Sequence, residues 1–95
     1  MQTGSDTGSA LVARALVPYN QKPDERAIAL LVDDLLRHGD SLLVHVAGRQ
    51  EAAAALGDWH RLTAEGPTDS PVGNWNHARA LARTVRSFRR VLAER

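Results

Sequence analysis

An apolar stripe with helical spacing runs through residues 28–47 and keeps its phase across a glycine. Gly39 lies in the middle of the stripe, whose other members fall on one side of a helix: Ile28, Leu31, Val32, Leu35, Leu36, Leu42, Leu43, Val46 and Ala47. A loop at Gly39, with Asp40-Ser41 as a new N-terminal cap, would reset this phase. We therefore expect one helix from about residue 24 to 47, roughly 36 Å long.

The rest of the chain also has the composition of a helical protein. Ala and Leu, two strong helix formers, make up 27 of the 95 residues. No segment alternates apolar and polar residues for long enough to predict a strand. We expect an all-α fold, a small antiparallel bundle of three main helices plus a short N-terminal helix.

Proline and glycine place the predicted boundaries. Residues 1–8 are small and polar and predict a disordered tail, followed by a single helical domain over residues 9–95. Ser9 is a candidate cap for a short helix through Val17, which Pro18 ends. Residues 51–62 are helical by propensity, and the sequence leaves open whether the long helix continues into them past Gly48. Residues 65–73 predict a loop, with Asn74 as the cap of a last helix to about residue 94.

Several function classes lack the residues that they need. The chain has no Cys, which removes disulfides, thiolate catalysis and Cys-based zinc sites. No serine lies in a nucleophile motif and no Gly-rich phosphate loop is present. The sequence favours a protein that is not an enzyme and needs no cofactor. No apolar run is long enough for a membrane span and no signal peptide is visible at the start, so we expect a cytoplasmic protein that does not bind a membrane.

A metal site is the first chemical alternative. Asp34, His38 and His45 project from one flank of the long helix, and imidazole and carboxylate groups bind divalent metals. His38 and His45 are about two turns apart, however, which is too far for one ion. We expect no metal, and these side chains are then solvated or bonded to a neighbouring helix.

Two stripes share the last helix. One has the three- and four-residue spacing of a core stripe: Trp75, Ala78, Leu81, Ala82, Val85, Phe88 and Leu92. Beside it lies a stripe of four arginines, Arg79, Arg83, Arg86 and Arg90. Like charges at these spacings oppose helix formation by about 0.2–0.5 kcal/mol per pair. We therefore expect an anionic group to offset the arginine stripe.

The source of that negative charge has two interpretations. Residues 73–95 carry six Arg and one Glu, whereas residues 1–72 carry six basic and ten acidic residues, and the net charge is +1. The simpler interpretation places carboxylates of the same bundle against the stripe: Asp33, Asp34, Asp40, Glu51, Asp58 and Glu65. Otherwise an acidic partner protein, a nucleic acid or a phosphorylated small molecule faces it. The near-neutral total charge and the missing helix-turn-helix spacing count against nucleic acid.

Leu30 and Val44 predict a second contact surface. Both fall opposite the main apolar sector of the long helix. Single exposed apolar residues are ordinary, but two on one back face can mark an interface. A chain this short has a limited core and gains stability from association.

The two tryptophans offer a third alternative. Trp59 and Trp75 are expected to pack the core, since adjacent residues such as Asp58, Trp59 and His60 diverge around a helix. If they line the end of the bundle beside the 65–73 loop, then Trp59, Trp75, His60 and His77 would form a small-molecule pocket.

A family resemblance rests on two stretches of the chain. LLVDDLLRHGDSLLVHV (30–46) and NWNHARALARTVRSFRRVL (74–92), with WHRL (59–62) between them, resemble small helical proteins of streptomycetes and other actinobacteria. The most specific element is His77-Ala78-Arg79-Ala80-Leu81-Ala82-Arg83. That family has no established function and is sometimes linked to natural-product biosynthesis. The resemblance implies a bacterial cytoplasmic accessory protein and supplies no catalytic residues.

These observations favour a non-catalytic accessory protein that self-associates or docks on a partner, such as a biosynthetic enzyme or regulator. The expected contact residues are Arg79, Arg83, Arg86, Arg90, Leu30 and Val44. One alternative is a regulator that binds nucleic acid through the arginine stripe. The other is a small-molecule binder or small enzyme of natural-product biosynthesis.

Overall fold

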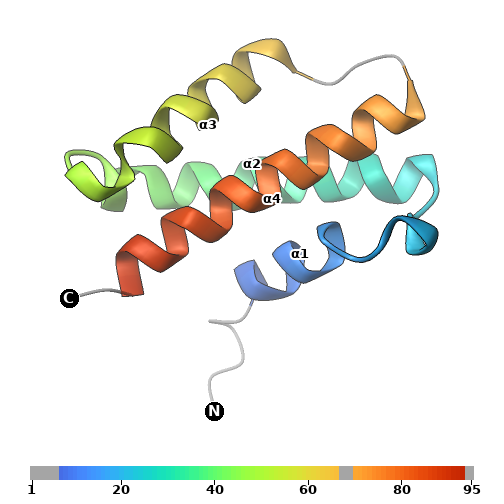
Figure 1. Ribbon diagram of the computed structural model, residues 1–95, viewed down its shortest axis with the longest axis horizontal. Coiled ribbons are helices and arrows are strands. Elements are labelled where there is room, and N and C mark those ends of the chain that lie inside the picture. Colours follow the sequence, from blue (N-terminus) through green and yellow to red (C-terminus); the bar gives the residue numbers. More distant parts are fainter. Residues whose placement is uncertain (1–6, 67–69, 94–95) are drawn as a thin grey trace.

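The computed structural model describes residues 7–66 and 70–93, and these form four α-helices. The helices are α1 (Thr7–Ala15), α2 (Glu25–Val46), α3 (Ala53–Glu65) and α4 (Pro71–Ala93), with short 3-10 turns η2 (Tyr19–Gln21) and η3 (Gln50–Ala52) before α2 and α3. Consecutive helices run antiparallel, and α4 crosses α2 obliquely with α1 and α3 on either side (Figure 1). No strand occurs within the described ranges. The predicted all-α bundle of three main helices and a short N-terminal one is confirmed.

Helix α2 is a single helix through Gly39, as the phase of the apolar stripe predicts. Its N-terminus is capped by Asp24, whose Oδ1 accepts a hydrogen bond of 2.8 Å from the backbone N–H of Ala27. Gly39 is buried, and a Cβ atom there would overlap the ring of Trp59. The helix ends before Gly48, whose φ of 85° is strained for other residues. The alternative left open at Gly48 is thus resolved as a break.

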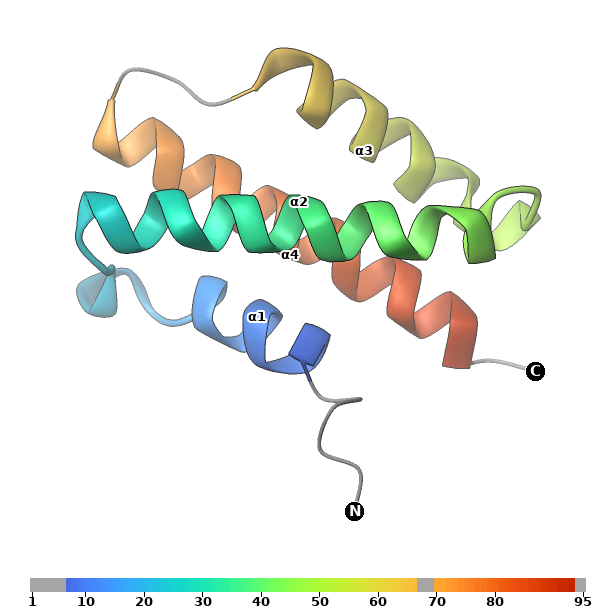
Figure 2. The ribbon, with the colours of Figure 1, turned by 180° about the vertical axis from the view of Figure 1, so that it is seen from behind.

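The core lies between α2 and α4 and extends under α1 and α3. The largest fully buried side chains come from the three main helices: Trp59, Trp75, Phe88, Ile28, Leu31, Leu35, Leu81, Val46 and Val85. The predicted stripe of α4 is buried except at its end. There Val91 is buried and Leu92 is only half-buried. Because α4 crosses α2 at an angle, the last turn of α4 lies to one side of α2 (Figure 2).

The N-terminal boundary differs from the prediction. Residues 1–6 of the expected tail lie outside the described ranges, but Thr7 and Gly8 belong to α1, so Ser9 is not its cap. Gly8 is buried against His38 and Arg89, which keeps the first turn of α1 packed on the bundle. At its other end α1 stops at Ala15, two residues earlier than expected. Pro18 disfavours a helical conformation in the residue before it.

The start of α4 was also predicted wrongly. The helix begins at Pro71, so Asn74 lies inside it and its N–H donates to the carbonyl of Ser70 at 2.9 Å. The Ser70 hydroxyl accepts a hydrogen bond of 2.8 Å from the N–H of Gly73, as an N-cap does. Proline is favoured in the first turn because its missing N–H would be unbonded there in any case. Helix α3 ends at Glu65, with Gly66 as its C-terminal cap. The predicted loop 65–73 therefore loses Glu65 to α3 and residues 71–73 to α4.

Candidate functional site

Three arginines of α4 point into solvent on the face opposite the core. Arg83, Arg86 and Arg90 are exposed, and we call them the arginine face. They are held there because the other side of the helix is buried by residues such as Leu81, Val85 and Phe88. Spacings of three and four residues place them in one strip about 10 Å long.

Arg79 belongs to the same predicted stripe but has a different role. Its Nη1 donates to the backbone carbonyls of Ala15 at 3.1 Å and Val17 at 2.6 Å, and the guanidinium lies 5.6 Å from the ring centre of Trp75. These carbonyls sit at the C-terminus of α1, where helix carbonyls lack intrahelical partners and favour a cation. Arg79 therefore fastens α1 to α4, and three arginines of the predicted stripe remain exposed.

The acidic residues that the structure describes form no ion pair with the arginine face. The ion pairs join Arg37 with Asp34 at 3.3 Å, Arg49 with Glu51 at 3.5 Å, and Arg61 with Asp58 at 3.6 Å and with Glu65 at 3.8 Å. In residues 7–66 and 70–93 no carboxylate is within ion-pair distance of the arginine face. None of the predicted carboxylates forms an ion pair with these three arginines in the described ranges, although Asp58 lines the same groove as Arg83. Four acidic side chains of the described ranges pair instead with Arg37 of α2, Arg61 of α3 and Arg49, which precedes η3.

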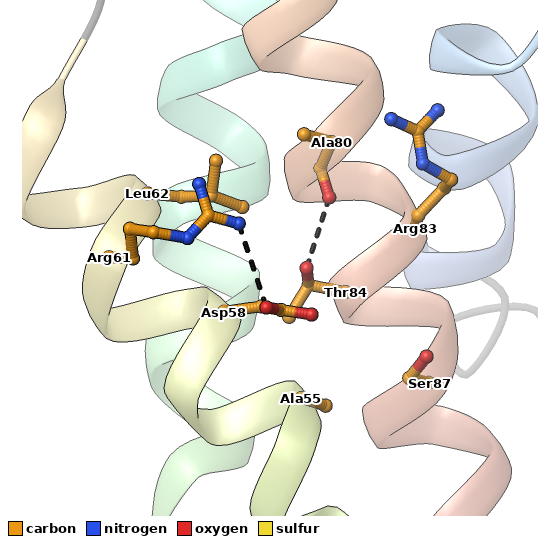
Figure 3. Close-up of a pocket in the computed structure, with 8 residues that line it drawn as sticks. All are labelled: Ala55, Asp58, Arg61, Leu62, Ala80, Arg83, Thr84 and Ser87. Carbon is orange, nitrogen blue, oxygen red and sulfur yellow. Dashed lines mark hydrogen bonds and ion pairs between the residues drawn. The ribbon is translucent and has the colours of Figure 1, made fainter.

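A polar groove borders the arginine face between α3 and α4. Its volume is about 280 Å³, and its lining is Ala55, Asp58, Arg61, Leu62, Ala80, Arg83, Thr84 and Ser87. Figure 3 shows the paired Asp58 and Arg61 on the α3 side, while the Arg83 side chain extends away from α3. The Thr84 hydroxyl donates to the Ala80 carbonyl at 3.0 Å. The groove thus presents charged and hydroxyl groups that suit the binding of a polar chain segment.

Leu30 and Val44 lie on the outer face of α2, as expected. Their exposed fractions are 59% and 75%, and on the helical wheel they lie opposite the buried residues of α2, such as Ile28 and Leu35. The sequence reasoning did not single out Val72 of α4, which is 52% exposed. Val72 falls eleven residues before Arg83, so the helical wheel would have placed it on the same exposed side of α4.

The four residues of the predicted small-molecule pocket do not form one: three of them are buried and His60 is exposed. Trp59 and Trp75 are at most 1% exposed, and the rings of Trp59 and Phe88 are 5.7 Å apart, so both tryptophans pack the core as first expected. His60 is exposed and His77 is buried. Burial lowers the pKa of His77, and the negative charge of Glu65 partly offsets that effect. None of the four lines the groove of Figure 3.

The two histidines of α2 lie in different surroundings. His45 is exposed, whereas Nε2 of His38 is buried and has no hydrogen-bond partner. Burial lowers the pKa of His38, and the nearby charge of Arg89 lowers it further. Over the described ranges no three His, Asp or Glu side chains are placed so that they could hold a metal ion.

Among the described residues no helix is both long enough and apolar enough to cross a membrane.

Comparison with known proteins gives a family without an assigned function. No curated protein and no solved structure is significantly similar to the chain. A family model described as a family of unknown function, DUF6415, matches residues 6–95, and the chain therefore belongs to the DUF6415 family.

Proposed function

We propose that this chain is a non-catalytic interaction protein that docks an acidic segment of a partner protein on the arginine face of α4. The observation that carries the proposal is the exposure of Arg83, Arg86 and Arg90 without a carboxylate from the described part of the chain. The like-charged pairs Arg83–Arg86 and Arg86–Arg90 oppose helix formation by about 0.2–0.5 kcal/mol each. A partner's carboxylates would remove this repulsion.

The geometry favours a helical acidic segment. Arg86 and Arg90 are four residues apart and Arg83 is three before Arg86, so carboxylates at the same spacings on a second helix would meet them. Guanidinium groups bind carboxylates through two parallel hydrogen bonds, which fixes the register of such a segment. Thr84 and Ser87 line the groove beside Arg83 and offer further polar contacts to the edge of the docked segment.

Nucleic acid is the less favoured ligand for this face. The net charge of the whole chain is only +1, whereas nucleic-acid-binding domains are strongly basic. Asp58 and Glu65 lie on α3, and Asp58 lines the groove next to the arginine face. A phosphate backbone that runs along the groove would meet these carboxylates, whereas an acidic helical segment can turn its carboxylates to the arginine face and neutral polar side chains to the groove.

The test uses a fluorescent Ala-based helical peptide with Glu at alternating spacings of three and four. The triple variant R83Q/R86Q/R90Q should bind it at least about tenfold more weakly than the parent chain. The matched control R14Q/K22Q/R26Q removes the same charge from exposed positions in α1, in α2 and between η2 and α2. This control should weaken binding less than about threefold. Far-UV circular dichroism checks that both variants keep their helices.

Other outcomes would contradict the proposal. Equal weakening by the two triple variants would show that only total charge matters. Tighter binding of a 20-base-pair DNA duplex, lost in R83Q/R86Q/R90Q and falling steeply with salt, would replace the acidic protein with nucleic acid. A dimer seen by light scattering that dissociates in the same variant would make the partner a second copy of this chain.

We also propose, on the resemblance of residues 30–46 and 74–92, that the partner is a biosynthetic enzyme or regulator in the cytoplasm of an actinobacterium. A strain in which the R83Q/R86Q/R90Q allele replaces the natural one should then make less of the natural product. An unchanged metabolite profile at normal protein level would refute this part.

A further inference from the structure

A second cleft lies between α1 and α2 and shares no residue with the groove of Figure 3. Its volume is about 520 Å³, within the range of about 300–1,000 Å³ typical of small-molecule sites. Leu11 and Arg14 of α1 form one wall, and Asp34, His38 and Ser41 of α2 belong to the other. The two helices lie side by side in both ribbon views (Figures 1 and 2).

The charges of the cleft favour a singly charged anion. Arg14 and Arg37 both line it, and among residues 7–66 and 70–93 Arg14 has no ion-pair partner. Arg37 is 3.3 Å from Asp34 through Nη1, which leaves its other N–H donors available. Two guanidinium groups and one carboxylate leave one positive charge uncompensated. A phosphate, which carries close to two negative charges at neutral pH, would be repelled by Asp34.

The remaining walls are uncharged. Leu11 is 5% exposed and contributes an apolar surface beside Arg14. The imidazole of His38 stays neutral near pH 7, because burial and the charge of Arg89 both lower its pKa. Its Nε2 packs against Gly8 of α1, where the two helices meet. A ligand would therefore find a cationic rim and an uncharged wall in which Leu11 is the apolar part.

We propose that the cleft between α1 and α2 binds a small amphipathic carboxylate, with its carboxylate on Arg14 and Arg37 and its apolar body against Leu11. Such a ligand contacts both helices and binds only when α1 is docked on α2. It therefore stabilises the folded chain by mass action. The site is independent of the arginine face, because it uses other helix surfaces and other arginines.

The probe is 4-phenylbutyrate, and its neutral amide 4-phenylbutyramide is the matched ligand. Backbone ¹H–¹⁵N spectra of the full chain should show saturable shifts confined to residues 8–14 and 34–41 with the carboxylate. Binding of the amide should be at least about tenfold weaker, because a charge-assisted hydrogen bond is lost.

Variants separate a built site from general attraction to positive charge. Arg14→Gln and Arg37→Gln should each weaken binding of the carboxylate about tenfold. Arg26→Gln, which removes one charge from an exposed position outside the cleft, should change it less than twofold. Equal binding of acid and amide, shifts centred on the arginine face, or no saturation up to the solubility limit would each overturn the proposal.

Discussion

At two helix–helix junctions, a glycine of one helix allows an aromatic ring from another helix to pack against it, but the two rings differ in chemistry. Gly39 of α2 admits the indole of Trp59 from α3, and Gly8 of α1 admits the imidazole of His38 from α2. The indole is 1% exposed and packs with Phe88, so the first junction adds apolar burial. At the second junction a buried nitrogen has no hydrogen-bond partner and the charge of Arg89 is close. We infer that the α2–α3 junction stabilises the fold strongly and that the α1 junction is the weaker one.

The largest expected effect comes from removing the indole of the first junction. Trp59→Ala should lower the free energy of unfolding by about 3–5 kcal/mol, because it leaves a cavity between α2, α3 and α4. Urea unfolding followed by circular dichroism measures the loss. His60→Ala, at the exposed next position, is the control and should stay within about 0.5 kcal/mol of the parent. A loss below 1 kcal/mol for Trp59→Ala would mean that the two junctions do not differ in this way.

The second largest expected effect comes from replacing Gly39, against which the indole of Trp59 packs. Gly39→Ala should destabilise the chain by about 1–3 kcal/mol, since its Cβ would overlap the ring of Trp59. This sign is opposite to the intrinsic preference of helices for Ala. Gly57→Ala on α3 is the matched control, because its Cβ meets nothing within 4 Å and should add up to about 1 kcal/mol of stability. The same urea titration reads both, and a stabilised Gly39→Ala variant would refute the close packing.

The glycine under the imidazole should matter less. Gly8→Ala should cost about 1 kcal/mol, because the atoms in its way are the ends of the side chains of His38 and Arg89, which can move. Faster hydrogen exchange confined to the amides of α1 would show that this helix opens locally. In a His38→Ala background the same substitution should lose much of its effect. Equal costs in both backgrounds would place the strain elsewhere.

The smallest expected effect is a dependence of stability on pH. The pKa of His38 is lowered in the folded chain by burial and by Arg89, from an ordinary value of 6.5, so the unfolded chain binds the proton more tightly. The stability that depends on neutral His38 is therefore complete above about pH 6.5 and is lost as the pH falls below it. His77 contributes with the same sign, because burial lowers its pKa. Urea unfolding at pH 7.5 and pH 5 should show a smaller difference for His38→Gln than for the parent chain.

The sequence was sufficient for the features that depend on one helix at a time. The unbroken phase across Gly39 correctly predicted one long α2, and the period of the apolar residues correctly predicted the buried side of α4. The start of α4 was readable as well, since Ser70-Pro71 is a common cap and first-turn pair. The density of Pro and Gly in residues 65–73 was instead interpreted as loop up to Asn74.

The candidate sites depend on how helices cross, and the pattern within one helix does not contain that information. The four arginines of α4 have equivalent spacings, and only the position of the α1 C-terminus distinguishes Arg79 from Arg83. The cleft between α1 and α2 was missed for the same reason, because Arg14 and Arg37 meet only after two separate helices pack. Helical periodicity predicts which side of a helix is exposed, but not what another helix brings to it.

The bonds of Arg79 also constrain the order in which the chain acquires its structure on the ribosome. They join residues 15 and 17 to residue 79, so α1 is synthesised first but receives this clamp only when most of the polypeptide has emerged. Until then the apolar side of α1, with Leu11, Val12 and Ala15, lacks its cover from α4. A nascent chain arrested before residue 79 should therefore leave α1 accessible to proteases and chaperones, and release of the last helix should close it.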